Sequence, residues 1–96
     1  MFMVKIHRGP NGSVLAVCDE SILGMTFSEG KISLHVSEGF YGGDSVSEEI
    51  MVEHFNRASS INIVGNEAVS VAIREGFVDA DKILVIDGVR HAQVLR

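Results

Sequence analysis

Apolar residues alternate with polar ones near both ends of the chain and recur about every 3.6 residues in its middle, which indicates strands around a helical centre. The first eight residues, MFMVKIHR, alternate as a half-buried strand does. Its two sides carry Phe2, Val4 and Ile6, and Met3, Lys5 and His7. The turn residues of GPNG, Gly9 to Gly12, then predict a hairpin into a second strand, SVLAVC. A third alternating strand is expected at KISLHV, residues 31–36, with Ile32, Leu34 and Val36 inward.

Two amphipathic helices are expected in the middle of the chain. The first runs from about Val46 to Ala58, with a core face made by Met51, Phe55 and Ala58. The second runs from about Glu67 to Glu75, between a cap at Asn66 and a stop at Gly76. The segment SINIVG between the helices favours a short extended piece, and KILVID and GVRHAQVLR are expected as the last two strands.

This order of elements favours an α+β fold with two layers. We expect a two-layer α/β sandwich, with a mixed or mostly antiparallel sheet of about five strands and two main helices on one face. With 96 residues and no linker, the chain is expected to be a single domain, residues 1–96. The other face of the sheet would then meet solvent or a partner. Outward Met3, Leu15 or Val17 would let two copies pair as a homodimer.

The stretch FYGGDSVSEE, residues 40–49, has the glycines of a phosphate loop and the polar residues of a helix start. Ser45 and Glu48 have the spacing of a capping box. Acidic residues after the glycines would compete with a phosphate, and the lysine of a phosphate loop is missing. We therefore expect a glycine turn followed by a helix N-terminus, with Tyr41 as a contact residue on an exposed Phe40–Gly43 loop.

The composition and residue spacing predict where the protein resides and whether it binds a metal or a cofactor. Cys18 is the only cysteine, so no disulfide joins the chain internally and a reducing, cytoplasmic location is expected. The N-terminus carries no signal-peptide pattern, and no apolar run approaches a membrane span. The four histidines are far apart in the sequence, and no ligand pair has zinc spacing. No metal and no cofactor is expected.

One nucleophile is conceivable. Cys18 beside Asp19 would be activated if His91 or His7 lay near and if the thiol stood at the start of a short helical turn. The alternative is that Cys18 ends a strand as a small buried residue. Asp19 itself is expected to cap that turn, residues ESIL.

Charge is unevenly distributed along the chain, whose net charge is -5. The helical half holds mostly acids, whereas basic side chains fall on the outward positions of the strands. The candidates for a mildly basic open sheet face are Lys5, His7, Lys31, His35 and Arg90. Such a face would hold RNA, a ribonucleoprotein or an acidic protein. The alternative is that these are ordinary solvated strand residues, and no RNP-like aromatic motif is present.

Several separated motifs resemble one known family. AVCDESILG, FYGGDSVS, INIVGNEAVSVAI and GVRHAQ are together similar to an uncharacterised archaeal family, the domain of unknown function numbered four-two-four. The resemblance covers nearly the whole chain, although the family pattern has a proline where this chain has Arg90. It implies an archaeal cytosolic protein with a compact two-layer α/β sandwich and no established activity. The matching polar or glycine positions are His7, Cys18, Asp19, Tyr41, Gly42, Gly43, Asn62, Gly65 and His91.

Two hypotheses of different classes follow. In the first, the protein is a small non-catalytic binding or accessory module, and Lys5, Lys31 and Arg90 share a face. In the second, it is a small enzyme or ligand-binding protein that uses Cys18, Asp19 and His91 in a pocket around the Phe40–Gly43 loop. The sequence names neither a substrate nor a partner.

Overall fold

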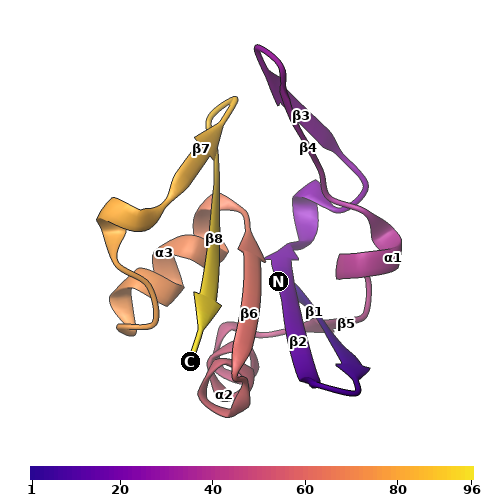
Figure 1. Cartoon of the computed structure of the whole chain (residues 1–96), viewed down its shortest axis with the longest axis vertical. Helices are drawn as coiled ribbons and strands as arrows, with labels where there is room; N and C mark the ends of the chain where they lie inside the picture. The colour runs from indigo at the N-terminus through magenta and orange to yellow at the C-terminus, as the bar shows by residue number, and fades with distance from the viewer.

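Eight strands form two separate sheets in the computed structural model, which describes residues 1–96. The main sheet has six strands in the order β5-β1-β2-β6-β8-β7 (Figure 1). These strands are β5 (Asp44–Val46), β1 (Phe2–Gly9), β2 (Gly12–Asp19), β6 (Ser60–Val64), β8 (Val89–Leu95) and β7 (Leu84–Ile86). Only β2 and β6 run parallel, so the sheet is mixed and mostly antiparallel, as expected.

Two helices cover one face of this sheet. They are α2 (Glu48–Arg57) and α3 (Asn66–Arg74), which lie behind β6 and β8 in Figure 1. The helices bury Met51, Phe55 and Val69 against alternate residues of the strands, such as Val17 and Ile63. The two-layer α+β sandwich with both main helices on one face is therefore confirmed, and the count of six strands exceeds the expected five.

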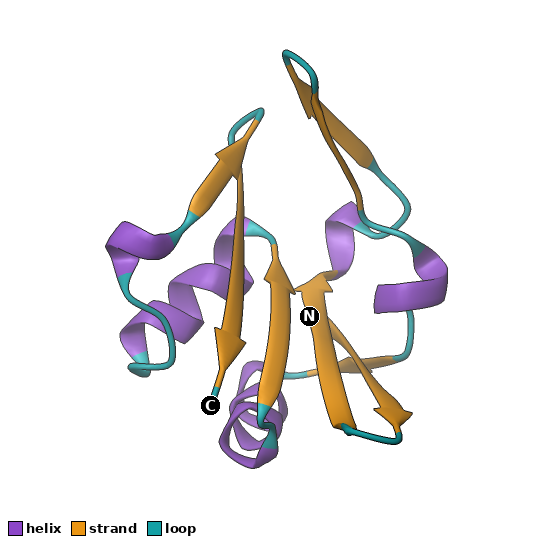
Figure 2. Ribbon diagram, viewed as in Figure 1, coloured by secondary structure: helices purple, strands orange, loops and turns teal.

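The opposite face carries a second, smaller core. It is covered by the short helix α1 (Glu38–Tyr41), by the 3-10 turn η1 (Glu20–Ile22) and by a hairpin of β3 (Thr26–Glu29) and β4 (Ile32–His35), which is drawn at the top of Figure 2. Val36 and Tyr41 pack there on Ala16, Cys18 and Val64. This cover extends over one end of the sheet only. The expectation of a wholly uncovered face is therefore wrong, and the residues of this face that stay exposed include Gln93 and Leu95 of β8 and Leu84 of β7.

Position in the sheet corrects two further expectations. Leu15 and Val17 are buried against the helices, not outward, because side chains alternate along β2 and Ala16 and Cys18 occupy the opposite face. The segment KISLHV pairs only with β3 and forms a separate two-stranded sheet. Lys31 therefore lies at the turn of a projecting hairpin, and Ile32 beside it is 60% exposed. On β7, Leu84 and Val85 are also exposed, whereas Ile86 is buried.

Helix α2 begins two residues later than its sequence pattern predicts. Ser45 lies in β5, which pairs with β1, so the expected Ser45–Glu48 capping box does not form. Ser47 caps the helix instead, since its hydroxyl accepts a hydrogen bond from the amide of Ile50 at 3.3 Å. The competing strand pairing explains the shift, because a residue in a strand ladder cannot also adopt the cap geometry.

A second 3-10 turn, η2 (Ala80–Lys82), connects α3 to β7. None of the helices has both the length and the apolar character that crossing a bilayer requires.

Candidate functional site

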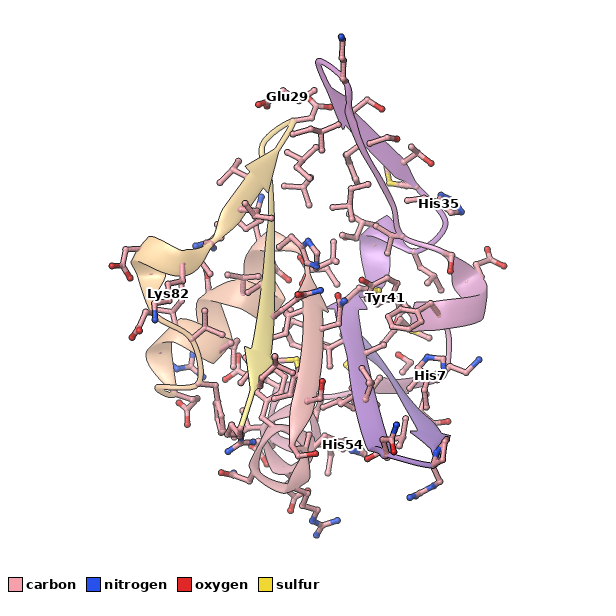
Figure 3. The ribbon with its side chains drawn as sticks, viewed as in Figure 1. His7, Glu29, His35, Tyr41, His54 and Lys82 are labelled. Carbon is pink, nitrogen blue, oxygen red and sulfur yellow. The ribbon has the colours of Figure 1, made fainter.

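Three side chains from three elements meet at the edge of the covered part of the sheet. Tyr41 of α1 donates its hydroxyl hydrogen to Oδ1 of Asn62 on β6 at 2.6 Å, and Nε2 of His91 on β8 lies 3.1 Å from the same oxygen. Figure 3 shows Tyr41 between α1 and the sheet. All three residues were candidates in the sequence analysis, and the fold brings them together. The expectation that Tyr41 is a contact residue on an exposed loop is wrong, because Tyr41 ends α1 and is buried against the sheet.

The hydrogen bonds define the protonation of this cluster. Because Oδ1 of Asn62 accepts the hydrogen bond, Nε2 of His91 carries the proton and donates it. Burial lowers the pKa of His91, so the neutral ring is favoured. Burial also raises the pKa of Tyr41 to about 12, and the nearby Cys18 contributes to the increase. The cluster is therefore uncharged near neutral pH. Both of its hydrogen bonds to Asn62 use Oδ1, and neither uses the amide N–H groups of that side chain.

Next to the cluster lies a groove, which we call the amide groove. It has a volume of about 270 Å³ and is lined by Val14, Phe40, Ser60, Ile61, Asn62, Gln93, Val94 and Leu95. Asn62 and Gln93 are direct partners in the β6–β8 register, so their two amides stand side by side. A second hollow continues from Gln93 along β8 to His91, Leu84 and Lys82. No carboxylate lines either hollow, in a chain with 13 acidic residues.

Phe40 forms one wall of the amide groove, and its position is fixed by β1. The ring of His7 stacks on the ring of Phe40 with centroids 4.5 Å apart and an interplanar angle of 11°. Nε2 of His7 also lies 2.7 Å from the carbonyl oxygen of Phe40, and Nζ of Lys5 donates to the carbonyl of Gly39 at 2.8 Å. Lys5 and His7 therefore hold α1 on the sheet.

The structure gives no support to Cys18 as a nucleophile. The residue is fully buried, and burial together with the charge of Asp19 raises the pKa of its thiol to about 12. Both carboxylate oxygens of Asp19 accept hydrogen bonds from backbone amides in the first turn of α3. The side chain of Asp19 makes no hydrogen bond to η1, so the expectation that it caps this turn is wrong. His91 is bonded to Asn62. None of the described hollows is lined by both Cys18 and His91.

The expected basic face does not form. Arg90 lies on the helical side of β8, where its guanidinium donates to the carbonyl of Asn66 at 2.6 Å and to the hydroxyl of Ser70. Lys31 is at the hairpin turn. The prediction that Lys5, Lys31 and Arg90 share a face is therefore wrong, because alternate residues of a strand point to opposite sides and Arg90 shares the side of Ala92.

The remaining histidines lie far from one another. Nδ1 of His35 is 2.8 Å from Oγ1 of Thr26 on the hairpin, and His54 is on α2. Figure 3 shows His7, His35 and His54 at separate places on the molecule. No group of three or more His, Cys, Asp or Glu side chains is arranged to hold a metal ion.

Sequence reasoning did not name Gln93, Leu95 or Lys82 as site residues, and it named Phe40 only as one end of the Phe40–Gly43 loop. The signal for Gln93 was available, since it lies two residues after His91 in a strand and so shares its side. Nothing in the sequence indicates that β8 pairs with β6, and without that pairing Gln93 cannot be placed beside Asn62.

Comparison with known proteins gives a family and a fold relative. The model of a family described as "Protein of unknown function (DUF424)" matches residues 6–96. A crystal structure of an uncharacterized conserved protein from Methanopyrus kandleri, an archaeon, is similar with a TM-score of 0.76 and 31% sequence identity. The match covers 99% of this chain and 93% of that one. A search of curated proteins finds no match.

Proposed function

This chain belongs to the DUF424 family of unknown function, and we propose that it is a non-catalytic RNA-binding protein that uses the amide groove to hold an unpaired base. One observation carries the proposal. A chain of net charge -5 has a groove on its sheet without any carboxylate, and that groove presents two neighbouring amides and an aromatic ring. These are the groups with which proteins recognise unpaired bases.

The groups in the groove fit the chemistry of a base. Side-chain amides form paired hydrogen bonds with base edges, and Asn62 keeps free donors while Gln93 is exposed. Phe40 offers an aromatic surface, already supported on one side by His7. Drug-sized ligands occupy pockets of about 300–1,000 Å³. The groove volume of about 270 Å³ therefore suits a ligand of the size of a single base.

Contacts to phosphates contribute little in this proposal. Lys82 is the only permanently cationic residue that lines the two hollows. A single-stranded partner with one or two phosphate contacts gives a salt slope of about -0.7 to -1.4 in log K against log salt. The affinity is then modest and depends mainly on base recognition. The location we propose is the cytoplasm, where the unpaired thiol of Cys18 stays reduced.

An amide chemical-shift titration with short single-stranded RNA tests the proposal. We expect saturable shifts at Asn62, His91 and Gln93, and an affinity that falls by less than about tenfold between low and moderate salt. The variant Gln93→Ala should weaken binding about tenfold, as expected for the loss of paired hydrogen bonds to a base. Asn56→Ala is the matched control, because it removes an exposed amide from α2.

Two results would contradict RNA binding at this groove. In the first, no resonance of the groove shifts at low salt. In the second, polyglutamate shifts the same resonances as strongly as RNA, which would favour the alternative of an acidic protein partner.

A further inference from the structure

A third hollow lies on the opposite face of the sheet from the amide groove. It is about 260 Å³ in volume, between the β1–β2 hairpin and the C-terminal turn of α2. Its apolar wall includes Ile6 and Leu15, and its polar groups are those of Arg8, Ser13, His54 and Arg57. We call these four residues the basic pocket.

The basic pocket has positive charge without a balancing group in the protein. The three salt bridges of the structure use Arg74 and Lys82, so Arg8 and Arg57 have no acidic partner within 4.0 Å. No aspartate or glutamate lines the pocket. Glu53, one turn before Arg57 on α2, makes no ion pair with it. Two like charges in one hollow repel each other, and a bound anion would remove that repulsion.

The end of α2 does not oppose an anion as strongly as most helix C-termini do. Free carbonyl groups give a helix C-terminus a partial negative charge, which disfavours anions. Here the guanidinium of Arg96 donates to the carbonyl oxygen of Phe55 and, at 2.7 Å, to that of Ala58. Arg96 therefore offsets part of the negative charge at this helix end, and the side chains of Arg8, His54 and Arg57 form none of the ion pairs of the structure.

We propose that the basic pocket binds a phosphate group. A guanidinium matches two oxygens of a phosphate, two guanidinium groups on one anion give fork-shaped contacts from two sides, and the hydroxyl of Ser13 supplies another donor. Two sources have this chemistry: free phosphate or a phosphomonoester, and the phosphodiester of a nucleic acid. The site is separate from the amide groove, because its residues lie on the helical face of the sheet.

The test follows the Nε–Hε resonances of Arg8 and Arg57 by NMR while inorganic phosphate is added at constant ionic strength, with sodium chloride as the reference salt. We expect saturable shifts with phosphate and none with chloride. Arg8→Gln and Arg57→Gln should each weaken binding about tenfold or more, since each removes a charge-assisted hydrogen bond. Lys31→Gln is the matched control, because it removes one positive charge from the exposed hairpin turn.

A second titration uses a dinucleotide that has one internal phosphodiester and no terminal phosphate. Saturation by phosphate alone identifies a free phosphate or phosphomonoester, whereas saturation by the dinucleotide identifies a nucleic-acid backbone. If neither saturates these resonances, or if Lys31→Gln weakens binding as much as Arg8→Gln, the basic pocket is not a phosphate site. Resonances of Asn62 and Gln93 are recorded in the same spectra, so failure here is distinguishable from failure of the amide groove.

Discussion

Asp19, the last residue of β2, accepts a hydrogen bond at 2.8 Å from the backbone amide of Ala68 in the first turn of α3, 49 residues later in the chain. Its other oxygen accepts from the amide of Glu67 at 3.1 Å. A cap usually comes from the residue just before a helix. In this protein that residue is Gly65, which has no side chain, and Asp19 takes over the role from a neighbouring strand.

Substitution of Asp19 should destabilise the fold. Asp19→Ala removes two hydrogen bonds to a carboxylate and leaves two amides unsatisfied, and we expect the free energy of unfolding to fall by about 2–3 kcal/mol. Urea denaturation measures the loss. Asp81→Ala, which removes an exposed acid from η2, should change stability by less than about 0.5 kcal/mol. Equal losses in the two variants would show that Asp19 does not stabilise α3.

Two nearby glycines, Gly43 and Gly39, should respond differently to substitution by alanine. A Cβ on Gly43 would collide with the carbonyl oxygen of Val4, because β5 pairs closely with β1 at this point. A Cβ on Gly39 in α1 would meet nothing within 4 Å. We expect Gly43→Ala to lower the free energy of unfolding by about 2 kcal/mol or more, and Gly39→Ala to raise it by about 0.5 kcal/mol through helix propensity.

Thermal or urea unfolding of both glycine variants checks this pair. If Gly43→Ala is as stable as Gly39→Ala, the close approach of β5 to β1 is not a constraint.

Local patterns predicted the elements of this fold well, and they failed where distant segments compete for the same residues. The sides of β1 and the core face of α2 follow from spacing alone. Ser45 was placed in a helix cap because nothing local shows that β1 recruits Asp44–Val46 as a strand. The roles of Asp19 and Arg90 were missed for the same reason, since their partners lie 49 and 24 residues away.

The sequence predicted which residues belong to the candidate site but not how they are arranged in space. Tyr41, Asn62 and His91 were all candidates, yet only the pairing of β6 with β8 and the docking of α1 bring them together. The expectation of a basic face was wrong because its members were placed on one surface from the outward positions of separate strands. Nothing local shows which side of β8 meets α3, or that β4 pairs only with β3 outside the main sheet.

Cys18 should be inert in the native protein. With a pKa of about 12, its thiolate fraction at pH 8 is roughly one in ten thousand, and the sulfur is fully buried. We expect iodoacetamide to leave the native protein unmodified at pH 8 over hours and to modify it within minutes in concentrated urea. Mass spectrometry measures both. Rapid alkylation of the native protein would restore the enzyme hypothesis, which needs a reactive thiol.

The stability of the protein should fall in mild acid because of His91. Burial lowers the folded-state pKa of His91 below the unfolded-state value of about 6.5. As the pH falls through that value, the unfolded chain takes up a proton before the folded protein does. The stabilisation is therefore complete above about pH 6.5 and is lost as the pH falls towards and below the folded-state pKa. Below that pH the folded protein has to keep a charged His91 ring in a half-buried site beside Tyr41 and Asn62, which lowers its stability.

Comparison of the wild type with His91→Gln isolates this effect, because glutamine does not titrate and keeps a donor for Asn62. We expect the free energy of unfolding of the wild type to decrease relative to that of His91→Gln between pH 7 and pH 5. His35→Gln is the control, since His35 is an exposed residue of the hairpin. A difference between wild type and His91→Gln that stays constant over this range would mean that His91 is not held neutral by the fold. The interpretation of Tyr41, Asn62 and His91 as an uncharged hydrogen-bonded cluster would then be wrong.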